Sequence, residues 1–300
     1  MRRWGIGLYG PAGYATDPAA IDRAVARLEA EGHQVIVDPT ARSRWQRFAA
    51  PDHERLGAIM RMARDPRVEL AIAVRGGYGW TRLLDRLDFA AIAASGTYWL
   101  GHSDFTAFQL AALAATGAVT YAGPMAAYDF GAETPSSFTM AHCWAMLDSA
   151  EQSIACALDG PALEVDGMLW GGNLAMVAHL AGTPHMPRVD GGVLFLEDVG
   201  EHPYRIERML YQLHYAGILA RQKAIVLGNF NGYELGANDN GYDFAAVVEQ
   251  ARERFEVPIY TGLAFGHCPD KLTLPHGGRC RLSAAAGAAV LTLAHAAVRA

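Results

Sequence analysis

Short apolar runs alternate with amphipathic stretches along the first half of the chain. Five apolar runs predict β-strands, at residues 4–9, 35–37, 70–74, 98–100 and 119–121. Between and after them, apolar positions recur at helical spacing, which predicts helices near residues 17–32, 53–64, 88–94, 106–115 and 137–147. Strands that alternate with helices are typical of a parallel sheet covered by helices on both faces.

The first of these helices has the clearest boundaries. Asp17 can cap its start, Pro18 suits the first helical position, and Gly32 suits its end. Ile21, Val25 and Leu28 recur at helical spacing and are expected to form the buried stripe of this helix.

The pattern changes near residues 158–166, where glycine, proline and short strand-like pieces replace the regular alternation. Beyond this point we expect strands at residues 163–165, 193–196, 224–227 and 272–274, and helices at 174–180, 204–215 and 244–254. The prediction is therefore an α/β protein of two domains. A parallel-sheet domain covers residues 1–160, and a smaller mixed α/β domain covers residues 161–300.

Composition restricts the classes of partner. Half of the 300 residues are hydrophobic (51%) and 19% are charged, which is typical of a globular protein with a substantial core. The formal net charge is −6 and no run of like charge occurs, so nucleic acid and membrane surfaces are not expected as partners. A small-molecule substrate fits this composition better.

No cofactor, metal site or membrane segment is expected. Gly7, Gly10 and Gly13 follow the first strand, but their spacing matches neither the dinucleotide-binding motif nor the P-loop. The four cysteines lack the spacing of a zinc site, and a reducing compartment is the default. The alanine-rich segment 283–300 is too short and too polar to span a bilayer. Only Lys223 and Lys271 are lysines, and neither lies in a suggestive motif.

One segment has the pattern of a nucleophilic serine. Residues 98–106 are predicted to form a strand, a tight turn and a helix start, with Ser103 on the turn. Such a turn exposes a hydroxyl at the carboxyl edge of the sheet, where the free N–H groups of the helix start can stabilise an oxyanion. The G-x-S-D sequence lacks the second glycine of the G-x-S-x-G elbow, and the alternative is that Ser103 only caps the helix.

A glycine-rich loop at residues 75–79 follows the strand at residues 70–74 and is expected at the same edge of the sheet. Glycine lets the backbone approach a substrate closely. The N–H of Gly77, or alternatively that of Gly76, is a candidate oxyanion donor beside the N–H of Asp104. An ordinary glycine turn is the other interpretation.

A nucleophilic serine needs a base, and the base needs a group that orients it. Glu197 ends an apolar strand, and His267 lies in a loop after residues 258–261. Together with Ser103 they would supply hydroxyl, imidazole and carboxylate. The alternatives are that Glu197 pairs with an arginine such as Arg205, and that His267 is a structural loop residue.

Six motifs, in this order and spacing, resemble the serine L,D-carboxypeptidases. This family includes murein tetrapeptide carboxypeptidases and the peptidases that give immunity to peptide-nucleotide microcins. The motifs are R-G-G-Y-G at 75–79 with R-L-L at 82–84, G-H-S-D-F-T at 101–106, G-G-N-L at 171–174, L-F-L-E-D at 194–198, P-Y-R-I at 203–206 and G-H-C-P-D-K-L-T-L-P at 266–275.

The resemblance implies that Ser103 is the nucleophile, His267 the base and Glu197 the residue that orients the base. It also implies a flavodoxin-like amino-terminal domain, a triad assembled across the cleft between the domains, and a homodimer. The function it implies is removal of the C-terminal D-alanine from murein tetrapeptide during cell-wall recycling in the cytoplasm. Two alternatives are a related serine peptidase or amidase that hydrolyses a peptide-nucleotide toxin, and a non-catalytic peptide-binding protein.

Four further residues are predicted to bind the substrate. Arg75 or Arg205 would bind its terminal carboxylate through two hydrogen bonds, unless either forms a structural ion pair. Gly76 would lie against the substrate. Trp170, next to two glycines, would form a wall of the pocket, and burial at the domain junction is its alternative.

Overall fold

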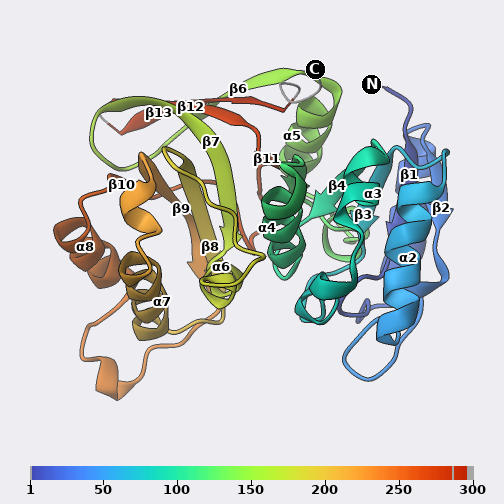
Figure 1. Cartoon of the computed structure of the whole chain (residues 1–300), viewed down its shortest axis with the longest axis horizontal. Helices are drawn as coiled ribbons and strands as arrows, with labels where there is room; N and C mark the ends of the chain where they lie inside the picture. The colour runs from blue at the N-terminus through green and yellow to red at the C-terminus, as the bar shows by residue number, and fades with distance from the viewer. Residues whose placement is uncertain (1, 286, 296–300) are drawn as a thin grey trace.

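The computed structural model of the chain describes residues 2–285 and 287–295. It contains two β-sheets with helices packed against them, and one sheet belongs mainly to each half of the chain (Figure 1). Within the described residues, the longest and most apolar helices fall short of what is needed to cross a membrane.

The first sheet has the strand order β11-β5-β4-β3-β1-β2. Its parallel strands are β1 (Gly5–Tyr9), β2 (Gln34–Val37), β3 (Leu70–Ala73), β4 (Tyr98–Gly101) and β5 (Thr120–Ala122). Helices α2 (Asp52–Arg64), α3 (Phe89–Ala94) and α4 (Phe105–Thr116) pack on one face, while α1 (Ala19–Ala30) and α5 (Ser137–Asp148) pack on the other. The predicted α/β fold with a parallel amino-terminal sheet is confirmed.

Helix α1 begins and ends close to the residues that the sequence predicted. The Asp17 carboxylate accepts a hydrogen bond from the backbone N–H of Ala19 (3.0 Å), and Gly32 takes a left-handed φ of +91° just after the helix. Ile21 and Leu28 are buried against the sheet, while Val25 is only half-buried at the edge of the stripe.

The second sheet has the order β10-β9-β8-β7-β12-β13-β6. Strands β7 (Leu163–Asn173), β8 (Val193–Val199), β9 (Ala224–Asn231) and β10 (Ile259–Tyr260) are parallel, and β12 (Arg279–Ala285), β13 (Ala288–Ala294) and β6 (Glu151–Cys156) continue the sheet in antiparallel order. Helices α6 (Leu174–Leu180), α7 (Pro203–Tyr215) and α8 (Phe244–Arg254) flank its parallel part (Figure 1).

Two strands cross the predicted boundary at residue 160. Strand β6 lies before this boundary but pairs with β13 of the second sheet. Strand β11 (Leu274–His276) lies in the second half but pairs antiparallel with β5 at the edge of the first sheet. The part of the alanine-rich segment that the structure describes forms most of the β12–β13 hairpin, in which inward and outward residues alternate. The two halves of the chain are therefore interlocked.

Helix α4 lies between the two sheets and contacts both α6 and β7 (Figure 1). The backbone N–H of Asn173, at the end of β7, donates to the Thr106 hydroxyl at the start of α4 (3.0 Å). A side chain at Gly172 would collide with Thr106, so glycine permits this close approach. The carboxyl ends of β4 and β7 are thus held side by side.

Candidate active site

Ser103 lies between β4 and α4 in a left-handed backbone conformation, with φ of +65°. Few residues other than glycine adopt this conformation, and such residues cluster at functional sites. The start of α4 has no side-chain cap, and the Ser103 hydroxyl instead faces His267. The interpretation of Ser103 as only a helix cap is therefore wrong.

Three side chains form one hydrogen-bonded chain. His267 Nε2 lies 3.0 Å from Ser103 Oγ, and His267 Nδ1 lies 2.8 Å from Glu197 Oε2. Because an ionised carboxylate only accepts hydrogen bonds, the proton belongs on Nδ1 and the lone pair of Nε2 faces the serine. This is the protonation that a base needs to take a proton from the hydroxyl.

Glu197 is fully buried in β8 and is supported from two sides. The Asn173 side-chain amide donates to Glu197 Oε1 (3.2 Å) and also to Asp198 Oδ1 (2.9 Å). On the other side, a Cβ at Gly266 would lie 3.0 Å from Glu197 Oε2, so a side chain there would crowd the carboxylate. The alternative pairing with Arg205 does not form, because Arg205 lies 3.7 Å from Glu201 instead.

Asp198 has a structural role beside Glu197. Its carboxylate accepts hydrogen bonds from the Asn173 amide and from the backbone N–H groups of Val199 and Ala175, each at 2.9 Å. Burial and the charge of Glu197 raise the pKa of Asp198 to about 6. These bonds fix the start of α6 next to the site.

The glycine-rich loop lies directly against the serine. A Cβ at Gly76 would lie 3.0 Å from Ser103 Oγ and 3.2 Å from the backbone nitrogen of Asp104. Gly77 follows with a left-handed φ of +87°, and both glycines line the cavity in front of Ser103. The loop is held because Gly13 N–H donates to Gly76 O (2.8 Å).

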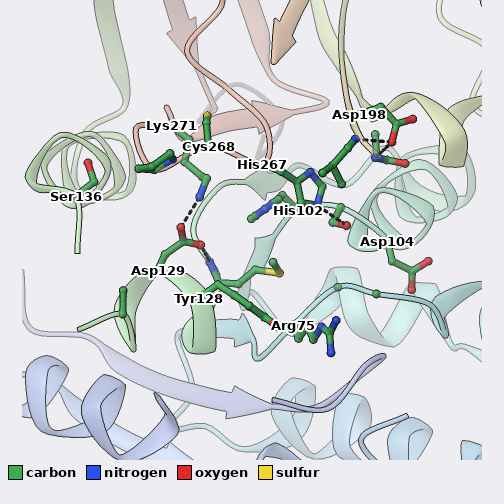
Figure 2. A pocket seen from close by; sticks show the side chains of 18 of the residues that line it. Arg75, His102, Asp104, Tyr128, Asp129, Ser136, Asp198, His267, Cys268 and Lys271 are labelled. Carbon is green, nitrogen blue, oxygen red and sulfur yellow. Dashed lines mark hydrogen bonds and ion pairs between the residues drawn. The ribbon is translucent and has the colours of Figure 1, made fainter. Parts of the chain in front are cut away.

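The Asp104 side chain turns away from His267 (Figure 2). Its Oδ2 accepts a hydrogen bond from Trp80 N–H (3.1 Å), which ties the serine turn to the loop after Gly79. Burial raises the pKa of Asp104 to about 7. The backbone N–H of Asp104, not its side chain, is therefore the group available to the site.

The cavity in front of Ser103 has a volume of about 850 Å³ and is lined by both domains (Figure 2). Its charged lining residues are Arg47, Arg75, Asp104, Asp129, Asp198, Glu201 and Lys271. Arg75 is half-buried, donates to Tyr14 O (3.1 Å) and lies 5.6 Å from the centre of the Tyr128 ring. A peptide with charged groups can enter this space.

Two predicted substrate-binding residues are elsewhere. Trp170 is only 1% exposed, and its indole N–H donates to Gln222 Oε1 (2.9 Å) within the core, so its predicted role as a pocket wall is wrong. Arg205 on α7 lies beside Tyr204 and Glu201 and is not among the cavity-lining residues, so its role in carboxylate binding stays a prediction. Trp170 lies next to a motif, but its side chain points into the core.

Three cavity residues were not predicted from the sequence. Lys271 and Asp129 form an ion pair in which both side chains are nearly buried. His102 Nδ1 donates to Gly123 O (2.9 Å), burial lowers the pKa of its imidazole, and its ring centre lies 5.2 Å from that of His267. The position of Lys271, four residues after His267 in the same motif, was the available signal.

The site joins a hydroxyl, an imidazole and a buried carboxylate through hydrogen bonds, and it lies beside the N–H groups of a helix start. This arrangement on an α/β fold is typical of a serine hydrolase. The chain belongs to the LD-carboxypeptidase family. Residues 6–123 match the LD-carboxypeptidase N-terminal domain, and residues 166–282 match the LD-carboxypeptidase C-terminal domain. The protein is therefore a serine carboxypeptidase of this family.

Individual relatives are similar over most of the chain. The probable murein peptide carboxypeptidase of Bacillus subtilis is 30% identical over 291 residues, which are 95% of this chain and 91% of that protein. The crystal structure of muramoyltetrapeptide carboxypeptidase from Oxalobacter formigenes is 48% identical with a TM-score of 0.91, over 96% of this chain and 98% of that one. The microcin C7 self-immunity protein MccF of Escherichia coli is 26% identical over 75% of this chain and 74% of its own.

Proposed function

We propose that this enzyme removes the C-terminal D-alanine from murein tetrapeptide during cell-wall recycling, with Ser103, His267 and Glu197 as its catalytic triad. The observation that carries the proposal is the hydrogen-bonded chain from Ser103 through His267 to Glu197 at the wall of a peptide-sized cavity. The substrates named for its relatives from Bacillus and Oxalobacter support the choice of substrate.

In the proposed mechanism, His267 Nε2 takes the proton of the Ser103 hydroxyl as the serine oxygen attacks the carbonyl carbon of the penultimate residue. Glu197 keeps the imidazole in the required tautomer and stabilises its positive charge. The N–H groups of Asp104 and Gly77, with Gly76 beside them, stabilise the oxyanion, and each donor typically contributes about 10²- to 10³-fold.

The second half of the reaction uses the same groups. His267 returns the proton to the amine nitrogen of D-alanine, the C–N bond breaks, and the peptide stays on Ser103 as an ester. His267 then takes a proton from water, which attacks the ester, and Ser103 regains its proton. Arg75 lines the cavity beside the glycine-rich loop and remains a candidate for binding a carboxylate of the peptide.

The test is incubation with L-Ala-γ-D-Glu-meso-diaminopimelate-D-Ala, followed by mass spectrometry for the loss of one alanine. The enzyme should release D-alanine, and Ser103→Ala should lose nearly all turnover while its unfolding curve stays close to that of the wild type. Substantial D-alanine release by purified Ser103→Ala would refute the assignment of the nucleophile.

A second candidate is hydrolysis of a peptide-nucleotide toxin by the same chemistry. The observation that favours it is Tyr128, a half-exposed aromatic residue that lines the cavity and offers a surface for base stacking. Assay of an aminoacyl sulfamoyl adenosine beside the tetrapeptide separates the two substrates. Labelling of Ser103 by a fluorophosphonate argues against the third possibility, a peptide-binding protein without catalysis.

The proposal also includes a cytoplasmic location and a homodimer, which the resemblance to the family implies. Light scattering on the purified protein measures the oligomeric state, and fractionation of cells that express it measures the location. A monomer, or a protein in the envelope fraction, would contradict these parts of the proposal and leave the chemistry untouched.

A further inference from the structure

A carboxypeptidase must place the α-carboxylate of the terminal residue close to its base. His267 gives its proton to the amine nitrogen of the leaving amino acid. The carboxylate carbon of that amino acid is only two bonds from this nitrogen, a separation of about 2.5 Å. The group that binds the carboxylate must therefore lie in the part of the cavity next to His267.

Three cations line the cavity, and they differ in environment. Arg47 is exposed, and Arg75 is half-buried with one guanidinium N–H already bonded to Tyr14 O. Lys271 follows His267 by four residues on the same loop, and its side chain is only 5% exposed. A cation shielded from water forms the strongest hydrogen bonds to a carboxylate.

The Lys271 ammonium retains unused hydrogen-bond donors. It carries three N–H groups, and Asp129 is its only partner among the residues that the structure describes. Figure 2 shows this pair on the cavity wall, on the side of the pocket that faces His102. The other two N–H groups therefore have no protein acceptor in the described structure.

Asp129 positions the ammonium without using all of its donors. The carboxylate of Asp129 is itself held, because its Oδ2 accepts a hydrogen bond from Met125 N–H (2.7 Å). Pairing with Asp129 reduces the cost of burying the lysine charge in the absence of substrate. The ion pair has no net charge, but its ammonium still presents hydrogen-bond donors to an incoming anion.

The loop that carries Lys271 is fixed to the amino-terminal domain. The Thr139 hydroxyl donates to Pro269 O (2.7 Å) and accepts from Lys271 N–H (2.9 Å). The positive charge of Lys271 also contributes to the lowered pKa of His102, after the larger effect of burial. Lys271 is therefore held at a fixed position near His102, whose ring is adjacent to that of His267.

We propose that the Lys271 ammonium, held by Asp129, binds the α-carboxylate of the leaving amino acid and so restricts cleavage to the last peptide bond. This inference rests on the proposed function. It assigns terminal-carboxylate recognition to Lys271, in place of Arg75 or Arg205. The expected substrates are peptides that fit the cavity and end in a free carboxylate.

The test compares two substrates that differ only at the end, the tetrapeptide with a free terminal carboxylate and the same peptide ending in D-alaninamide. The measured quantity is the ratio of kcat/KM for the acid to kcat/KM for the amide. The wild type should prefer the acid, and Lys271→Met should reduce the ratio by about 10- to 100-fold, the range expected for a hydrogen bond between charged groups. Cleavage of the amide should change about threefold or less.

Two further variants complete the test. Lys271→Met leaves the buried Asp129 carboxylate without a cation, so the double variant Lys271→Met/Asp129→Asn, which removes both charges, is less prone to misfold. Arg75→Met is measured in the same assay as the competing assignment. The rate of fluorophosphonate labelling at Ser103 reports in every variant whether the triad is intact.

The outcomes are distinct. A ratio that collapses in both Lys271 variants, with labelling unchanged, supports the inference. Equal losses for acid and amide, or a collapse in Arg75→Met alone, would overturn it while the proposed function stands. If the wild type releases neither alanine nor alaninamide, the proposed function fails and the inference fails with it.

Discussion

Gly76 offers a sharp test of how the substrate approaches the nucleophile. In Gly76→Ala, the added methyl group would lie 2.8 Å from Ser103 Cβ, 3.0 Å from Ser103 Oγ and 3.2 Å from the backbone nitrogen of Asp104. The first of these distances is shorter than two carbon atoms can share without a shift of the backbone. The methyl group is therefore next to both the proposed nucleophile and the proposed oxyanion donor, Asp104 N–H.

The size of the effect follows from this position. A carbonyl carbon must come within about 3–3.5 Å of the attacking oxygen, and the methyl group occupies part of that space. Displacing the reacting atoms by about 1 Å costs on the order of 10²-fold, and loss of one oxyanion donor costs about 10²- to 10³-fold. We therefore expect kcat/KM for D-alanine release to fall at least 100-fold in Gly76→Ala.

The assay measures kcat/KM for D-alanine release and the rate of fluorophosphonate labelling at Ser103. Gly32→Ala is the matched control, because Gly32 is exposed after α1, has φ of +91° and has no atom within 4 Å of an added Cβ. It should cost about 1 kcal/mol of stability and leave activity unchanged. If folded Gly76→Ala retains activity and labelling within about threefold of the wild type, the proposed path of attack is wrong.

Two other predictions concern carboxylates at the site. Glu197→Gln should lower kcat by up to about 10⁴-fold with little change in KM, because a glutamine N–H facing His267 favours the wrong imidazole tautomer. A decrease in kcat of less than about tenfold would refute the role of Glu197. Asp104 has a folded-state pKa of about 7 against an ordinary value near 3.8, so the unfolded state loses its proton first as pH rises, and stability falls from about pH 4 to pH 7. In urea unfolding, the free energy of unfolding of Asp104→Asn should rise relative to that of the wild type by on the order of 1–4 kcal/mol across that window, with no further rise above it. Parallel pH profiles of this free energy for the two proteins would contradict the prediction.

The amino-terminal sheet was predictable because its signals are local. Strand β3, for example, is buried at all four positions, and a short apolar run between polar segments indicates such a strand directly. Strands β6, β12 and β13 were not predicted. Strands β12 and β13 form a local hairpin, but β12 also pairs with β7, and β13 pairs with β6, whose residues lie far away along the chain. Pairing over such distances has no local signature.

The same distinction applies to the site. The residue types at Ser103, Glu197 and His267 indicated their chemistry, and the structure brings them within hydrogen-bonding distance. The error at Trp170 arose because position next to a motif does not determine which way a side chain points. At the end of β7 all positions are buried, so Trp170 points into the core while Asn173, three residues later, reaches Glu197.

Ser103 follows β4 of the first sheet and His267 lies in the loop between β10 and β11, and hydrogen bonds hold the surrounding segments together on both sides. On the serine side, Thr106, three residues after Ser103, is bonded to Asn173, which in turn donates to Glu197. On the histidine side, Thr139 of the first domain bonds to both Pro269 and Lys271. A displacement of the domains that separated Ser103 from His267 would also have to break these buried bonds, each worth about 1 kcal/mol or more. The hydrogen bonds from Ser103 through His267 to Glu197 are therefore formed in the structure without substrate, and the proposed mechanism needs no closure of the two domains to form them.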